Sequence, residues 1–275
     1  MGLFVLGALA VLVIGILAGQ PAWQRWQRRR LRSQAFPAYW RTVLRQRVPL
    51  VGRMPTDLQL QLKKAMQVFI AEKNFIGCKG LTITEEMRVV IAAQACLLLL
   101  NRPSDYFAAV RQILVYPGAF LAPRNAVDAA GVHSEHREAL IGESWSQGQV
   151  ILSWADTLEG AANAEDGRNV VIHEFAHQLD QENGAPLGAP PPLPGDTTRD
   201  ATRWSQVFGE AYFRVRAATQ RGEPCVLDAY AGHDPAEFFA VASETFFERP
   251  QALRAEFAAL YDELRGYYKV DPANW

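Results

Sequence analysis

The stretch NVVIHEFAHQLDQE, which begins at Asn169, places the strongest constraint on how this chain can fold. Two histidines, His173 and His177, stand four residues apart, and Glu174 directly follows the first. On an α-helix, side chains four residues apart project from one face, so the two imidazoles point the same way. The opposite face is apolar and consists of Ile172, Phe175, Ala176 and Leu179. The spacing therefore predicts an amphipathic helix with a core side and a site side.

The site side of this helix suits a metal ion. Two imidazoles at this spacing can take adjacent corners of a tetrahedral zinc site. Glu174 is offset by about 100° around the helix, where it can take a proton from a water that the metal activates. Asp180, three residues past His177, returns to the site face and could orient a ligand imidazole as a hydrogen-bond acceptor. The pattern fixes only three positions and also occurs without a metal, so a third ligand is needed.

Candidates for the third ligand lie in AYAGHDPAEFFAVASETFFERP, where Asp234 followed by a proline predicts a helix start. Glu237 could bind the metal, but Asp-x-x-Glu is also a variant of the capping box, in which the glutamate needs no metal. His233 is a rival ligand. Glu244 lies two turns further on, on the same face as Glu237. Sequence spacing alone leaves these three alternatives open.

The rest of the body indicates several helices and a small sheet. A strongly apolar helix is expected to begin at Thr84, because two glutamates follow it. Residues 112–118 and 148–156 are short, β-branched and predicted to be strands. The strand at 149–154 could pair with an extended substrate at a sheet edge. Further helical patterns lie at 199–220, 234–248 and 251–267, and the Pro-rich residues 184–196 indicate an exposed loop. This pattern predicts an α+β fold.

The chain begins with eighteen uncharged residues, Gly2 to Gly19. As a helix this run is roughly 27 Å long, close to the thickness of a bilayer core. The positive charges all follow it, in WQRWQRRRLR, which by the positive-inside rule places the rest of the chain in the cytoplasm. We expect a single-pass transmembrane anchor at 1–20 in the bacterial inner membrane. A cleaved signal peptide and a buried core helix are the alternatives.

Charge and cysteine content exclude several classes of protein. Residues 1–56 carry nine arginines and no acid, so all 29 acidic residues lie in the remainder, which is a poor nucleic-acid binder. The anchor is followed by a basic juxtamembrane segment and the start of the domain at 21–56, and the main domain is expected at 57–275. The three cysteines, Cys78, Cys96 and Cys225, form no CxxC pair, which argues against a disulfide framework and a cysteine-based zinc ribbon.

HEFAHQLD followed by YAGHDPAEFFAVASE resembles the Mlc titration factor A family of zinc peptidases. The segments GLTITEEMRVVIAAQACLLL, ILVYPGAF and GQVILSW also resemble characteristic segments of that family. The resemblance runs from about Phe75 to Trp275. More distantly, the HEFxH helix and the later EFFA are similar to the catalytic domain of anthrax lethal factor.

The resemblance implies a zincin-like metallopeptidase domain of the gluzincin type that binds one zinc ion per chain. His173 and His177 would be two zinc ligands, and Glu174 the general base. The resemblance selects Glu237 as the third ligand, and Tyr230 would stabilise the oxyanion. It implies a peptide or protein substrate, and a transcriptional regulator as a further partner. The alternative function is a zinc-containing, membrane-tethered protein that binds such a regulator with little or no peptidase activity.

Overall fold

The structure is a computed structural model that describes residues 19–118, 120–127, 133–140, 142–145, 148–184, 187–192 and 201–275. Residues 19–33 are helical. The other helices are α2 (Ala38–Arg47), α3 (Leu50–Arg53), α4 (Thr56–Glu72), α5 (Glu85–Leu97), α6 (Trp154–Ala162), α7 (Val170–Asp180), α8 (Ala201–Arg221), α9 (Pro235–Glu248), α10 (Pro250–Glu256) and α11 (Ala258–Tyr268), with 3₁₀ turns η1 (Gln181–Asn183), η2 (Ala229–Gly232) and η3 (Pro272–Asn274). The strands are β1 (Asn74–Gly77), β2 (Gln112–Tyr116), β3 (Phe120–Val127), β4 (His133–Leu140), β5 (Gly142–Trp145) and β6 (Gln149–Ser153).

The predicted membrane anchor at 1–20 lies outside the described residues except for its last two positions. Within the described part of the chain, no helix is both long enough and apolar enough to cross a bilayer. This finding contradicts the expected single-pass location in the inner membrane with the catalytic domain facing the cytoplasm. We therefore set that location aside.

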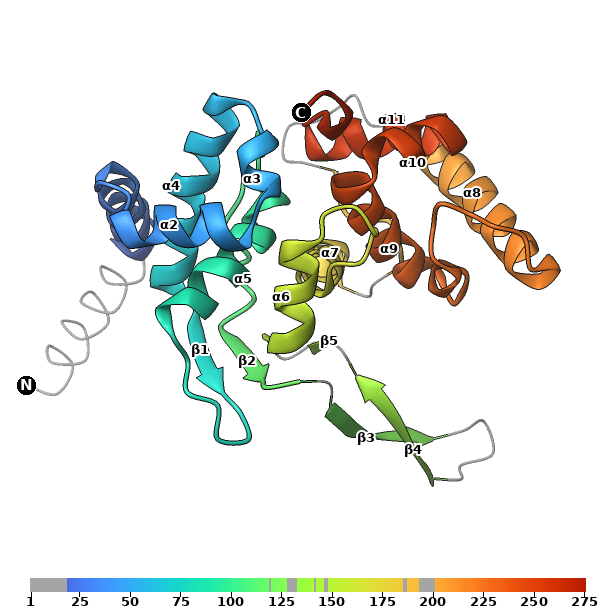
Figure 1. Ribbon diagram of the computed structural model, residues 1–275, viewed down its shortest axis with the longest axis horizontal. Helices are drawn as coiled ribbons and strands as arrows, with labels where there is room; N and C mark the ends of the chain where they lie inside the picture. Colours follow the sequence, from blue (N-terminus) through green and yellow to red (C-terminus); the bar gives the residue numbers. More distant parts are fainter. Residues whose placement is uncertain are drawn as a thin grey trace, which may run out of the picture.

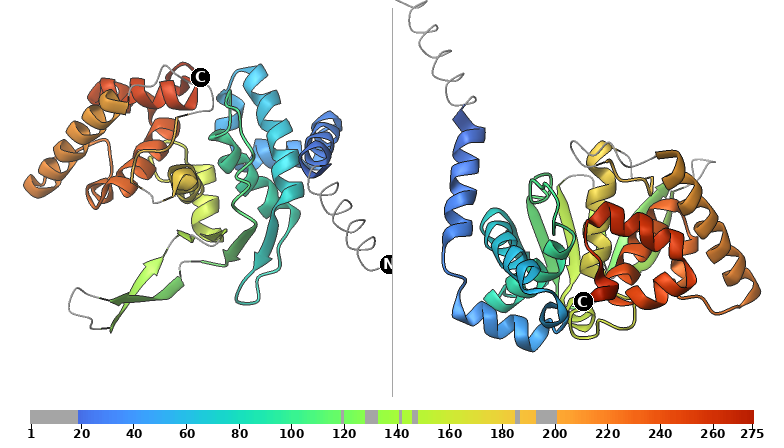
Figure 2. Two further views of the ribbon diagram at one scale, coloured as in Figure 1. Left: turned by 180° about the vertical axis from the view of Figure 1, so that it is seen from behind. Right: turned by 90° about the horizontal axis from the view of Figure 1, so that it is seen from above.

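The helix α7 lies between two groups of helices (Figure 1). The helices α2 to α5 lie on one side of it, together with the sheet, and α8 to α11 lie on the other. The view from above shows the same order, with α7 next to the strands (Figure 2). The hairpin of β3 and β4 projects away from the helices, apart from the four-stranded sheet. The predicted α+β arrangement of several helices and a small sheet is confirmed.

The main sheet has the strand order β1-β2-β6-β5. The first three strands are parallel, and Ile113 in β2 stands opposite Phe75 in β1 and Val150 in β6. β5 runs antiparallel to β6 and forms an edge of the sheet. The expectation that strand 149–154 offers an edge to a substrate is therefore wrong, because β6 is paired on both sides. Strand pairing depends on the whole topology, so the short segment alone could not predict it.

The predicted start of the apolar helix is confirmed, whereas two other predicted boundaries differ in the structure. Thr84 begins α5, and its Oγ1 accepts a hydrogen bond of 3.2 Å from the backbone N–H of Met87. The second predicted strand ends at Ser153 instead of 156, because this serine caps α6 and its Oγ accepts from Asp156 N. The helix expected at 251–267 is divided into α10 and α11 at Phe257, whose backbone leaves the helical region. Phe257 is buried, and no glycine or proline marks this break in the sequence.

One hydrophobic core joins both groups of helices through α7. Phe175 of α7 is fully buried, and its ring contacts Phe69 of α4 and Phe107 of the loop before β2. On the other side, α7 packs along α9, where Phe238 and Phe239 are also buried. Burial of aromatic rings on both sides fixes the position of α7, because each large ring contributes about 1.5–3 kcal/mol when removed from water. The site face of α7 is therefore held against α9.

Candidate metal centre

The helix α7 presents two imidazoles from one face, as the sequence spacing predicts. It begins after Asn169, whose side-chain oxygen accepts a 3.0 Å hydrogen bond from the backbone N–H of Ile172. The rings of His173 and His177 lie with centroids 4.8 Å apart and planes at 80°. Their Nε2 atoms are 3.2 Å apart. The two histidines therefore aim the same ring nitrogen at one point.

The helix α9 supplies a carboxylate to the same point. Asp234 caps α9 and accepts hydrogen bonds from the backbone N–H groups of Ala236 and Glu237. The Glu237 carboxylate points toward the imidazoles, with Oε2 3.0 Å from His173 Nε2 and 3.4 Å from His177 Nε2. Asp234 thus forms the cap, and the Glu237 side chain faces the two histidines. We call His173, His177 and Glu237 the three-ligand cluster.

The three-ligand cluster fits a metal ion. Its possible ligand atoms all lie within 4.8 Å of one another, and each side chain is at most 17% exposed. Glu237 Oε2 is buried and accepts no hydrogen bond of good geometry. A buried carboxylate oxygen without a donor is costly, and a cation between it and the imidazoles would remove that cost. Two nitrogens and one carboxylate oxygen are the donor set of many catalytic zinc sites.

The electrostatics of the cluster prepare it for a cation. Burial lowers the pKa of His173, but the carboxylates of Glu244 and Glu237 outweigh burial, and the pKa lies well above its ordinary value. Burial would raise the pKa of Glu237, yet its contacts with the two imidazoles lower that pKa strongly. Glu237 is therefore ionised at neutral pH and can serve as an anionic ligand. The Glu174 charge also raises the pKa of His173, so this buried carboxylate lies near the cluster.

Glu244, one of the three candidates for the third ligand, is not part of the cluster. Its Oε1 lies 2.7 Å from Nδ1 of His173, on the side of the ring away from the ligand nitrogen. His233 is also outside the cluster, because its side chain is 66% exposed and contacts Asp234. The sequence placed Glu237 and Glu244 on one face of α9, but which of them meets Nε2 depends on how α7 packs against that face.

Asp180 was predicted to orient a ligand imidazole, and its hydrogen bonds go elsewhere. Oδ2 accepts from the backbone N–H of Gly188 at 2.7 Å, and Oδ1 accepts from that of Ala189 at 2.9 Å. Its charge interacts with His177, but burial dominates and raises the pKa of Asp180. The carboxylate therefore anchors the Pro-rich segment after α7, which is held a second time by Trp204 Nε1 donating to the Gly188 carbonyl.

Tyr230 lies on η2, just before α9. Its ring centroid is 6.2 Å from that of His173, and its side chain is half exposed. Asp228 holds the start of η2, because it accepts from Tyr230 N at 2.9 Å and from Arg168 at 2.7 Å. The structure thus brings Tyr230 beside the three-ligand cluster, with a phenol that solvent or a substrate can reach.

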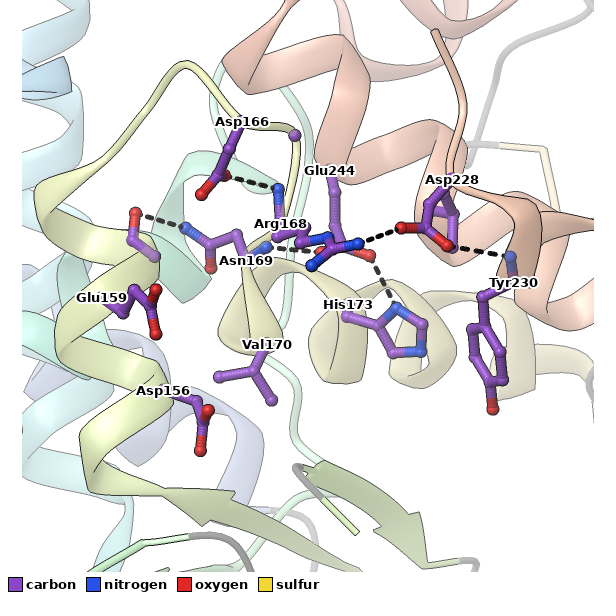
Figure 3. A pocket seen from close by; sticks show the side chains of 13 residues that line it. Asp156, Glu159, Asp166, Arg168, Asn169, Val170, His173, Asp228, Tyr230 and Glu244 are labelled. Carbon is purple, nitrogen blue, oxygen red and sulfur yellow. Dashed lines mark hydrogen bonds and ion pairs between the residues drawn. The ribbon is translucent and has the colours of Figure 1, made fainter. Parts of the chain in front are cut away.

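A cavity of about 450 Å³ opens beside His173 (Figure 3). Asp156 and Glu159 of α6 form one wall, and Asp228 and Tyr230 form the wall across from it. Arg168 crosses the middle and pairs with Asp228. This cavity has room for one residue of a bound peptide next to the cluster. The sequence did not predict that Asp156, Glu159 and Asp228 line a cavity, because the segments that carry them contain no recognisable motif.

The sequence matches known proteins over almost its whole length. The pattern that defines the family "Glucose-regulated metallo-peptidase M90" matches residues 23–269. An uncharacterised protein of Synechocystis sp. is 37% identical over 265 residues, which cover 95% of each chain. Mlc titration factor A of Yersinia pestis is 30% identical over 237 residues, which cover 86% of this chain and 85% of that protein.

The family match includes both helices of the three-ligand cluster. The matches agree with the resemblance found in the segments around HEFAHQLD and DPAEFFA. A metal-binding geometry and a metallopeptidase family are two independent observations that point in one direction. The chain belongs to the M90 family of metallopeptidases, the family of Mlc titration factor A.

Proposed function

We propose that this protein is a zinc-dependent peptidase that hydrolyses peptide bonds in a peptide or protein substrate. The observation that carries the proposal is the convergence of His173 Nε2, His177 Nε2 and Glu237 Oε2 on one point, with a buried glutamate directly after the first histidine. We assign this activity to a gluzincin-type domain at 57–275, with one zinc ion per chain held by the three-ligand cluster. Family membership supports the reaction class.

When bound there, zinc would act as a Lewis acid toward water and the substrate carbonyl. Glu174 takes a proton from the attacking water and delivers it to the leaving nitrogen, which is the role of a general base and then a general acid. Its position one residue after a ligand keeps it close to the reacting atoms while the histidines face the metal. Its burial limits competition from bulk water.

Tyr230 donates a hydrogen bond from its phenol to the carbonyl oxygen as negative charge develops there. Its position near His173 supports this role. Tyr230→Phe should lower kcat by about 10- to 100-fold with little change in KM, because the hydrogen bond forms mainly in the transition state. Steady-state kinetics on a peptide substrate measures both constants. An unchanged kcat would remove Tyr230 from the mechanism.

The substrate backbone pairs with β5, an edge strand of the sheet. β5 pairs with β6 on one side, no strand among the described residues pairs with its other side, and it lies beside α7. An extended peptide could add to this edge as a further strand, with main-chain hydrogen bonds that do not depend on sequence. Peptides that are N-methylated along the backbone near the cleaved bond should then have a higher KM than their parents. Equal KM values for every N-methylated position would contradict pairing at β5.

The test of the proposed function compares the wild type with Glu174→Gln. Both proteins should bind about one zinc per chain, because Glu174 is not a ligand, and the variant should turn over at least about 100-fold more slowly. Zinc is measured by elemental analysis and turnover with a quenched-fluorescence peptide library. Equal turnover in the two proteins would show that Glu174 is not the general base and would refute the mechanism. Zinc binding without cleavage of any peptide would favour the alternative, a zinc-containing protein that binds a regulator.

A further inference from the structure

Three glutamates of α9 form one row along the helix. Glu237, Glu244 and Glu248 are spaced seven and four residues apart, which places them within about 40° of each other around the helix axis. The first belongs to the three-ligand cluster, and the other two are buried, at 6% and 5% exposure. Buried carboxylates are rarely retained unless they are paired or hydrogen-bonded. The role of the second and third therefore needs an explanation.

Glu244 has both oxygens occupied by donors from the region where α7 begins. Oε1 lies 2.7 Å from His173 Nδ1, and Oε2 accepts a short hydrogen bond from the backbone N–H of Asn169. Asn169 is the residue whose side chain caps α7. One carboxylate thus contacts a ligand histidine and the residue that caps the helix carrying it.

The contact with Nδ1 decides which nitrogen of His173 is available to a metal. A neutral imidazole carries one hydrogen, and an acceptor at Nδ1 holds that hydrogen there. When a metal replaces the other proton, the lone pair that binds it is on Nε2, which faces Glu237 Oε2 at 3.0 Å. The second hydrogen bond, to the Asn169 N–H, prevents the carboxylate from rotating away. The ring plane and the start of α7 are therefore fixed by the same group.

We propose that Glu244 is the positioning residue of the metal centre: it holds His173 with Nδ1 protonated and Nε2 aimed at the ion. This inference rests on the proposed function only in that the three-ligand cluster binds zinc, and it does not require peptidase activity. Carboxylates that accept from a ligand histidine commonly alter metal affinity by about 10- to 100-fold when removed. The sequence offered Glu244 as a possible ligand, and the geometry gives it this different task.

Glu248 provides a matched control one turn further along α9. Its Oε1 accepts a hydrogen bond of 2.9 Å from Asn169 Nδ2. It is as buried as Glu244 and also contacts Asn169, but the partner of its Oε1 is this asparagine and not a ligand histidine. A change at Glu248 therefore tests packing and capping at this interface without altering the hydrogen bond to His173.

The experiment measures zinc affinity by competition with a chelator for the wild type, Glu244→Ala, Glu244→Gln and Glu248→Gln. We expect affinity to fall about 10- to 100-fold in Glu244→Ala. Glu244→Gln should lie between that variant and the wild type. Its amide oxygen can accept from only one of the two N–H groups that Glu244 serves. Glu248→Gln should stay within about threefold of the wild type. The Tm of each zinc-free protein shows how much each change affects folding alone.

A second readout separates positioning from general destabilisation. The visible absorption of the cobalt(II)-loaded protein reports the ligand geometry, and it should change in Glu244→Ala but not in Glu248→Gln. If Glu244→Ala is unfolded, Glu244→Gln carries the comparison. Zinc affinity in both Glu244 variants within threefold of the wild type, or an equal loss in Glu248→Gln, would overturn the inference. If the wild type binds no zinc, the proposed function is overturned as well. If it binds zinc but cleaves no peptide, the proposed function fails, and the zinc affinities of the variants still test this inference.

Discussion

The helices α7 and α9 both contribute to the metal centre, but they do so in different ways. α7 supplies two ligands four residues apart, so the geometry of a single helix makes them face the same point. α9 supplies one ligand from a row of three glutamates that look alike in the sequence, of which the second and third are buried. Their tasks differ only because different atoms of α7 lie opposite each one. A pair of ligands on one helix is a local property, whereas the role of a lone carboxylate is set by tertiary packing.

The largest effect should come from removing one ligand on each helix. His177→Ala and Glu237→Ala should each lower bound zinc from about one to below about 0.1 per chain after dialysis, because a catalytic site depends on three protein ligands. Elemental analysis checks the ratio. His233→Ala is the control, since this histidine is near Glu237 in sequence but exposed and outside the cluster. Retention of zinc by Glu237→Ala alone would show that α9 contributes less than α7.

The core faces of the two helices should be equally important for stability. Phe175 and Phe239 are both fully buried, so truncation of either ring to alanine should cost about 3–5 kcal/mol of unfolding free energy. Urea unfolding of the zinc-free protein measures this loss. Phe213→Ala, at a position 66% exposed on α8, should change stability by less than about 0.5 kcal/mol. A much smaller loss for Phe239 would mean that α9 is held by its carboxylates more than by its core.

Glu248 should make stability depend on pH. Burial raises its pKa to about 8, against the ordinary 4.5, although the hydrogen bond from Asn169 partly opposes this shift. The folded state then binds a proton that the unfolded state has lost, so this contribution is complete below about pH 4.5 and is lost as pH rises to about 8. The slope is at most about 1.4 kcal/mol per pH unit. Urea unfolding between pH 5 and 8 should show a smaller slope in Glu248→Gln, and an unchanged slope would assign the effect to another group.

The smallest effects should come from the two capping residues. Asp234→Ala removes the cap of α9 and should cost about 1 kcal/mol. Asn169→Ala should cost more, about 2 kcal/mol, because the same side chain also donates to Glu248 and its removal takes a hydrogen bond from that buried group. Thermal unfolding of the two variants gives the comparison. Equal losses would indicate that Glu248 finds another partner, such as water.

Local signals in the sequence predicted much of the fold. The Thr84 cap, the strand at 112–116 and the helix of His173 and His177 all depend on neighbours in the chain, and the structure shows them. The break at Phe257 and the interior place of β6 depend on distant packing, and the sequence alone predicted neither.

The site divides in the same way. The pairing of Glu244 with His173 requires two residues that are 71 positions apart in the chain, on different helices, to meet in one register. Asp180 also shows this limit, since the sequence predicts its place on the helix but not its hydrogen-bond partners, which come from the loop that follows α7. The local sequence determines which side of a helix a residue occupies. It does not determine which atoms of another segment that residue meets.

The segment after α7 carries two amide groups whose hydrogen exchange reports local motion at the end of this helix. The backbone of Gly188 has φ +70° and lies so close to the carbonyl of Pro235 that a β-carbon would overlap it. Its amide hydrogen and that of Ala189 are held by Asp180. These two amides exchange with deuterium when their hydrogen bonds to Asp180 break. Their exchange rates would therefore report how often the Pro-rich segment separates from the end of α7 in the resting protein.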